Sequence, residues 1–104
     1  MKFIEFSHPE GGRMIVEATR PVLPRGVRLH FDAVRGGWTL LAPERAIALD
    51  AAGEAILGEV DGERSVGEIA ARLAEKFAAP VEEILGDTRE FLQGLADRRL
   101  VDLQ

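Results

Sequence analysis

Few side chains in this sequence have the types and the spacing that catalysis requires. His8 falls in a loop-like stretch, and His30 falls on the outward face of a predicted strand with Asp32 two residues further on. Alternate residues of a strand share a face, so His30 and Asp32 could form an acid–base pair, but a solvated strand face is the simpler interpretation. The chain contains no cysteine, and its histidines and carboxylates do not have metal-ligand spacing. We therefore predict a protein that is not an enzyme and that needs no cofactor or metal ion.

The charged residues argue against nucleic-acid binding. Lys and Arg number 13 and Asp and Glu 18, which gives a formal net charge of −5. The first turns of the last predicted helix, which would approach base edges in a helix-turn-helix protein, carry Glu82, Glu83 and Asp87. Phosphate groups would repel these carboxylates. We expect no nucleic-acid partner, although a winged-helix DNA-binding protein remains an alternative.

Three short strands are predicted in the first half of the chain. Residues 27–33 alternate apolar and polar side chains, Gly36 and Gly37 provide a tight turn, and residues 38–41 return as a second strand. Pro43 ends that strand, and residues 45–50 form a third. Short connections of this kind favour an antiparallel meander in which the third strand is an outer edge.

Three helices are predicted in the second half. Asp50 is a plausible N-cap for a helix over residues 51 to about 60, and residues 65–68 match a capping box that starts the second helix. Pro80 precedes a third helix from residue 81 to about residue 98. The predicted fold class is therefore α+β, with a three-stranded antiparallel sheet followed by a three-helix bundle, in an arrangement like that of a winged helix-turn-helix.

Length and composition suit one compact domain. The chain has 104 residues, of which 46% are hydrophobic, and it has no apolar run long enough to cross a bilayer. It also begins without the apolar stretch of a secretory signal, so we expect a cytoplasmic protein with no membrane partner. Residues 1–20 are predicted to form an N-terminal arm or an extra hairpin, with strands at residues 3–6 and 14–18, that either docks or stays mobile. Residues 21–104 are predicted to form the domain itself.

The predicted third strand suggests peptide recognition. Residues 45–50 would present an open strand edge beside an amphipathic helix. An extended peptide can add to such an edge through main-chain hydrogen bonds and dock its side chains against the helix. The open edge also allows strand pairing between two copies, so we expect a monomer or a weak dimer.

Two segments resemble the PqqD family. They are Arg35-Gly36-Gly37-Trp38-Thr39-Leu40-Leu41-Ala42-Pro43-Glu44-Arg45 and Val60-Asp61-Gly62-Glu63-Arg64-Ser65-Val66. The resemblance extends over about residues 20–103. It implies a peptide chaperone in the biosynthesis of the redox cofactor pyrroloquinoline quinone (PQQ), which binds the ribosomal precursor peptide PqqA. It further implies presentation of PqqA to the radical SAM enzyme PqqE, which cross-links a glutamate and a tyrosine of that peptide.

The resemblance also implies where the peptide would bind. In this family the leader peptide adds to the third strand and packs against the third helix. Candidate peptide-binding residues are Arg45, Ala46, Ile47, Ala48 and Leu49 on the strand, and Leu85, Thr88, Arg89 and Leu92 on the helix. Arg45 and Arg89 could meet peptide carboxylates, whereas core packing explains Leu85 and Leu92 as simply. A recognition element for another ribosomal peptide pathway would have much the same core, and remains an alternative.

Overall fold

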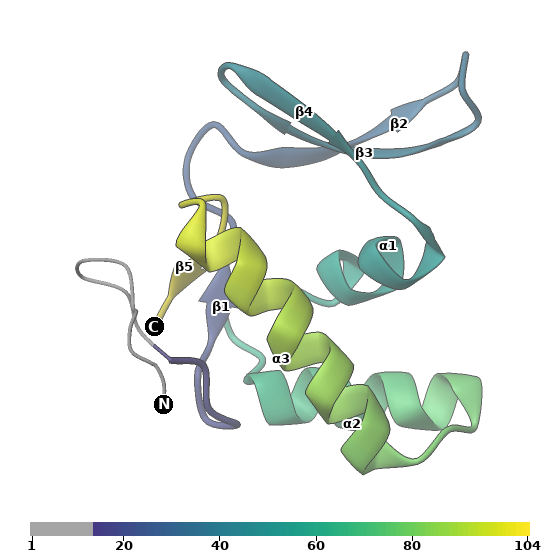
Figure 1. Ribbon diagram of the computed structural model, residues 1–104, viewed down its shortest axis with the longest axis vertical. Coiled ribbons are helices and arrows are strands. Elements are labelled where there is room, and N and C mark those ends of the chain that lie inside the picture. The colour runs from purple at the N-terminus through teal and green to yellow at the C-terminus, as the bar shows by residue number, and fades with distance from the viewer. Residues whose placement is uncertain (1–13) are drawn as a thin grey trace, which may run out of the picture.

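The computed structural model describes residues 14–104 and shows a small sheet followed by three helices (Figure 1). Its elements are β1 (Pro21–Val22), β2 (Arg28–Asp32), β3 (Gly37–Ala42), β4 (Arg45–Ala48), α1 (Ala51–Gly58), α2 (Val66–Phe77), α3 (Val81–Asp97) and β5 (Asp102–Leu103). The predicted α+β fold is confirmed.

The main sheet is an antiparallel meander with the order β2-β3-β4. Leu40 of β3 pairs with Leu29 on one side and with Ile47 on the other. The prediction that the third strand of this meander is an outer edge is therefore confirmed. The turn between β2 and β3 lies far from the helices (Figure 1), and Phe31 near it is 47% exposed, so β2 is less buried than its alternating pattern predicts.

The predicted caps position the first two helices. The Asp50 carboxylate accepts a hydrogen bond from the Gly53 N–H at 2.8 Å. The hydroxyl of Ser65 accepts from the Glu68 N–H at 3.1 Å, and the Glu68 carboxylate accepts from the Ser65 N–H at 2.8 Å, which completes a capping box. The hydrogen bond from Ser65 holds the pKa of the Glu68 carboxyl below its usual value. Helix α1 ends at Gly58, about two residues earlier than predicted.

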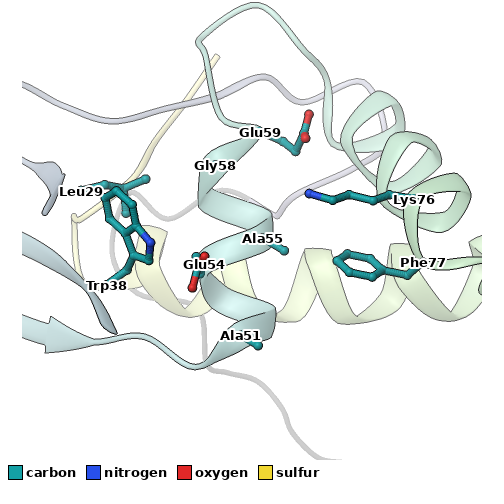
Figure 2. Close-up of a pocket in the computed structure, with 9 residues that line it drawn as sticks. All are labelled: Leu29, Trp38, Ala51, Glu54, Ala55, Gly58, Glu59, Lys76 and Phe77. Atoms are coloured by element: carbon teal, nitrogen blue, oxygen red, sulfur yellow. The ribbon is translucent and has the colours of Figure 1, made fainter. Parts of the chain in front are cut away.

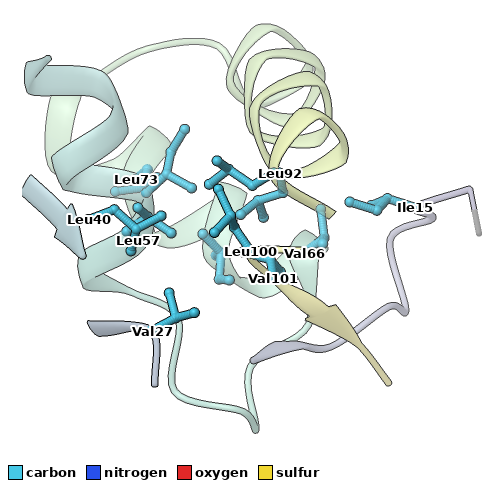
Figure 3. Packing of buried hydrophobic residues seen from close by; sticks show 12 residues of the cluster. Ile15, Val27, Leu40, Leu57, Val66, Leu73, Leu92, Leu100 and Val101 are labelled. Carbon is cyan, nitrogen blue, oxygen red and sulfur yellow. The ribbon is translucent and has the colours of Figure 1, made fainter. Parts of the chain in front are cut away.

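One hydrophobic core joins the sheet to the helices (Figure 3). Its fully buried side chains come from almost every part of the described chain, and they include Ile15, Leu40, Leu57, Ile69 and Leu92. Leu40 lies in the middle strand of the sheet, and Leu92 lies in the middle of α3. Both β4 and α3 pack against this core, and close-packed protein interiors are rigid. The core therefore holds β4 and α3 at a fixed separation.

A second, smaller sheet was not predicted. Strand β1 pairs with β5 at the other end of the chain, and the backbones of Arg20 and Gln104 exchange hydrogen bonds of 2.9 and 2.8 Å. The sequence did not predict this pair, because two-residue strands have no periodicity that a sequence could show.

Residues 14–20 pack on the helices and form no strand. Ile15 is buried, and its N–H donates to the Gln93 side chain at 2.9 Å. The carbonyl groups of Glu17 and Thr19 accept the N–H groups of Gly67 and Val66, which lie in the first turn of α2. The predicted strand over residues 14–18 is therefore wrong, because its backbone serves the helix N-terminus instead. The predicted strand over residues 3–6 lies outside the described residues, and the boundary at residue 20 stays a prediction.

No helix among residues 14–104 is long and apolar enough to cross a membrane.

Candidate functional site

The open edge of β4 offers backbone groups at alternate residues. In an antiparallel pair, residues that exchange hydrogen bonds with the partner strand alternate with residues whose N–H and C=O point away from it. The Leu49 N–H donates to the Trp38 carbonyl at 3.0 Å. Ile47, two residues earlier, therefore also faces β3, while Ala46 and Ala48 direct their N–H and C=O groups to the open edge. The sequence predicted an open edge over residues 45–50, and within residues 46–49 the register leaves only Ala46 and Ala48 with outward backbone groups.

A groove of about 400 Å³ lies between this edge and the second half of α3. Its lining residues are Ile47, Ala48, Leu49, Asp50, Glu90, Phe91, Gly94, Leu95 and Arg98. Most of the side chains that form its walls are apolar, and the charged ones lie among its helix and loop residues. An extended chain paired with β4 would therefore place side chains directly against α3.

Two residues of α3 determine the shape of the groove. Phe91 is held from behind by α1, because Gly53 approaches its ring so closely that an added Cβ would lie 3.0 Å from the ring's Cζ atom. Gly94, one turn further along, has nothing within 4 Å of the position that a Cβ would occupy. The helix wall is thus filled at Phe91 and open at Gly94.

The strand residues predicted for the site lie at or beside the groove. Ile47, Ala48 and Leu49 line it, and Ala46 is exposed on the neighbouring edge. Arg45 is exposed and donates from its Nη2 atom to the carbonyl of Arg98 at 2.9 Å. This contact connects the start of β4 to the end of α3.

The helix residues predicted for the site lie elsewhere on α3. Thr88 and Leu92 are completely buried, and Leu85 is half-buried against the core. Arg89 is exposed and lines a different hollow together with Met14. Core packing, the other interpretation that the sequence allowed, accounts for Leu92. Peptide contact by these four residues stays a prediction.

Sequence reasoning missed the helix residues that line the groove. They are Glu90, Phe91, Gly94, Leu95 and Arg98. The signal that could have found them is a row at helical spacing, because positions 91, 94, 95 and 98 recur every three or four residues along one face. That row flanks the buried stripe, and the hydrophobic pattern alone does not say which flank faces the strand.

A second hollow, of about 500 Å³, lies on another part of the molecule (Figure 2). Its lining residues come from β2, β3 and the first two helices, and in Figure 2 Trp38 and Phe77 lie on either side of α1. This hollow does not border the open edge of β4, so a chain bound there could not extend the sheet at β4. We therefore take the groove between β4 and α3 as the candidate site.

The family model described as "Coenzyme PQQ synthesis protein D (PqqD)" matches residues 37–101. The match runs from the start of β3 through the end of α3 and so contains both walls of the groove. The chain belongs to the PqqD family. The resemblance noted in the sequence is confirmed.

Relatives of this family match most of the chain. A Rhizobium meliloti protein named "PqqA binding protein" is 57% identical over 81 residues, which are 78% of this chain and 83% of that protein. The solution structure of the PqqD part of Methylobacterium extorquens PqqCD is described as a functional and stand-alone recognition element for ribosomally synthesized and post-translationally modified peptides. It matches with 45% identity and a TM-score of 0.70, and it covers 79% of this chain and 87% of that chain.

A crystal structure of PqqD from Xanthomonas campestris is also similar, with 40% identity, a TM-score of 0.53, and coverage of 76% of this chain and 88% of that chain. The Rhizobium meliloti relative is named for PqqA binding, and the Methylobacterium extorquens domain is described as a recognition element. The prediction that this chain is not an enzyme is therefore confirmed by its family.

Proposed function

We propose that this chain binds the PqqA peptide along the open edge of β4 and presents it to PqqE during PQQ biosynthesis. The observation that carries the proposal is the open backbone of Ala46 and Ala48 beside an apolar groove. The 57% identical relative named for PqqA binding supports PqqA as the peptide. The groove lies within the region that matches the PqqD family model.

The peptide would bind as a fourth strand of the sheet. Its backbone pairs with Ala46 and Ala48, and every second side chain then points toward the groove. Ile47, Leu49 and Phe91 offer apolar contacts to those side chains. A disordered peptide loses conformational entropy when it binds, so the apolar contacts must offset that loss.

Strand addition also explains how the peptide could be presented. An added strand keeps its own outer edge free, so PqqE can approach the peptide while this chain holds its inner edge. The peptide occupies the edge through which two copies could pair, so we take the working form to be a monomer. We place the complex in the cytoplasm, where a ribosomal peptide is made.

The proposal is tested by isothermal titration of the full chain with the PqqA peptide of Rhizobium meliloti, with a scrambled peptide of the same composition as control. We expect one-to-one binding of the native peptide with sub-micromolar affinity and no heat from the scrambled one. No binding of PqqA, together with binding of another leader peptide or of duplex DNA, would assign the chain to one of the two alternative functions.

A further inference from the structure

One corner of this acidic molecule is strongly basic. Arg25, Arg45, Arg98 and Arg99 surround a hollow of about 380 Å³, whose lining residues include one carboxylate, Glu44. We call these four residues the arginine corner. It lies in a chain of net charge −5, so the positive charge there is local and is not a property of the whole surface.

These guanidinium groups are available to a ligand. Within residues 14–104, none of the four arginines forms a salt bridge. Arg72, by contrast, pairs with the Glu59 carboxylate at 2.6 Å, so this chain does use carboxylates to hold arginines elsewhere. Among the described residues, these guanidinium groups make one hydrogen bond, from Arg45 Nη2 to the Arg98 carbonyl, and it leaves the other donors of that fork free.

The backbone of Arg99 provides an independent observation. Its φ is +63°, a left-handed conformation that glycine or asparagine usually adopts at the end of a helix. Hydrogen bonds of 2.9 Å from Arg99 to the Ala96 carbonyl and from Leu100 to the Leu95 carbonyl impose this conformation. Glycine would suit the position better, and what arginine adds there is a cationic side chain.

The arginine corner continues the peptide groove. Arg98 lines both the corner and the groove, and Arg45 is the first residue of β4. Neighbouring strands lie about 4.8 Å apart, a distance that an arginine side chain can span. A chain that pairs with Ala46 would therefore pass beside these side chains as it leaves the sheet.

We propose that the arginine corner binds carboxylates of an acidic segment of the peptide that adds to β4. This inference rests on the proposed function and names the chemistry that the groove selects at one end. Arginine forks match carboxylates in planar, bidentate geometry. A long polyanion such as DNA fits less well, because beyond the corner it would meet acidic residues such as Glu90.

The test uses Arg99→Gly in the full chain, because glycine suits the left-handed position and the variant should fold. We expect a higher melting temperature together with an affinity for Rhizobium meliloti PqqA that is about fivefold lower. A merely structural arginine would not give this combination. Arg35→Gly is the matched control, since it removes one exposed arginine from the distant β2–β3 turn and should leave the affinity unchanged.

The peptide provides the other half of the test. A PqqA peptide with every Asp and Glu replaced by Asn and Gln should bind wild-type chain more weakly, and Arg99→Gly should then make no further difference. Added salt should weaken binding of the native peptide more than binding of the neutral one.

Each outcome separates the two proposals. If wild-type chain does not bind PqqA, the proposed function fails and this inference fails with it. If wild-type chain binds PqqA but Arg99→Gly binds equally well, or if the neutral peptide binds as tightly as the native one, only this inference is overturned. Binding of duplex DNA that is lost in Arg99→Gly would also overturn it, because the corner would then serve nucleic acid.

Discussion

At the residue scale, two positions one helical turn apart on α3, Phe91 and Gly94, set the width of the peptide groove. Phe91 fills part of the wall and is backed by Gly53, whereas Gly94 leaves space beside β4. A glycine in the middle of a helix weakens that helix by about 1 kcal/mol relative to alanine. We infer that the open space that Gly94 leaves in the groove offsets this loss of helix stability.

Gly94→Leu tests this role of Gly94. The leucine should weaken PqqA binding about tenfold, because forcing a side chain into space that a ligand needs typically costs about 1–3 kcal/mol. Gly86→Leu is the matched control, since Gly86 lies in the same helix with equally open space but lines a different hollow. Both variants should be more stable than the parent by about 0.5–1 kcal/mol. Equal affinities for PqqA in the two variants, measured by titration calorimetry, would contradict the assignment of the groove.

Sequence patterns predicted single residues well where a local interaction decides their position. Asp50, Ser65 and Glu68 cap helices as expected, because a cap needs only residues within the same turn. Thr88 and Leu92 were predicted to contact the peptide; both are completely buried, and their contact with the peptide stays a prediction. A helical period identifies which residues share a face, but tertiary packing decides which flank of that face meets β4.

At the scale of elements, the site depends on β4 as an unpaired edge strand. The alternation of its backbone groups makes Ala46 and Ala48 the residues that a peptide can pair with. An edge of this kind usually invites pairing with other chains. In this molecule a strand that pairs with β4 would also place side chains in the neighbouring groove. Those side-chain contacts would allow the proposed site to select one peptide.

Ala46→Pro tests strand addition directly. Proline removes the outward N–H and is tolerated on an edge strand, so the variant should fold and bind PqqA about fivefold more weakly, in line with the loss of one hydrogen bond. Ala46→Val keeps the N–H and should bind as wild-type chain does. Unchanged affinity in a folded Ala46→Pro variant, checked by circular dichroism and calorimetry, would rule out backbone pairing at this residue.

The order of strands and helices could be predicted from the sequence, whereas part of their pairing could not. The meander follows from short turns that join consecutive strands. The β1–β5 pair joins opposite ends of the described chain through two residues each, and so short a strand has no pattern of its own. The outward direction of Ala46 and Ala48 likewise depends on register, which the hydrophobic pattern of β4 does not determine alone.

On the scale of the whole molecule, one core holds the strand wall and the helix wall of the groove together (Figure 3). The net charge of −5 disfavours nucleic acid, while the arginine corner provides a local site for carboxylates at one end of the groove. These features suit an extended peptide with an acidic segment at that end of the groove. The second hollow, shown in Figure 2, lies apart from the groove and the arginine corner. Its residues Trp38 and Phe77 can therefore be compared with those of the groove in a binding experiment.

Peptide addition at β4 is tested most directly by a titration of ¹⁵N-labelled full chain with Rhizobium meliloti PqqA, followed through the amide resonances. We predict shifts concentrated in residues 45–49 and 90–99, with little change at the Trp38 indole N–H and at Phe77. Shifts centred on Trp38 and Phe77, with β4 unaffected, would contradict peptide addition at β4 and would move the binding site to the second hollow.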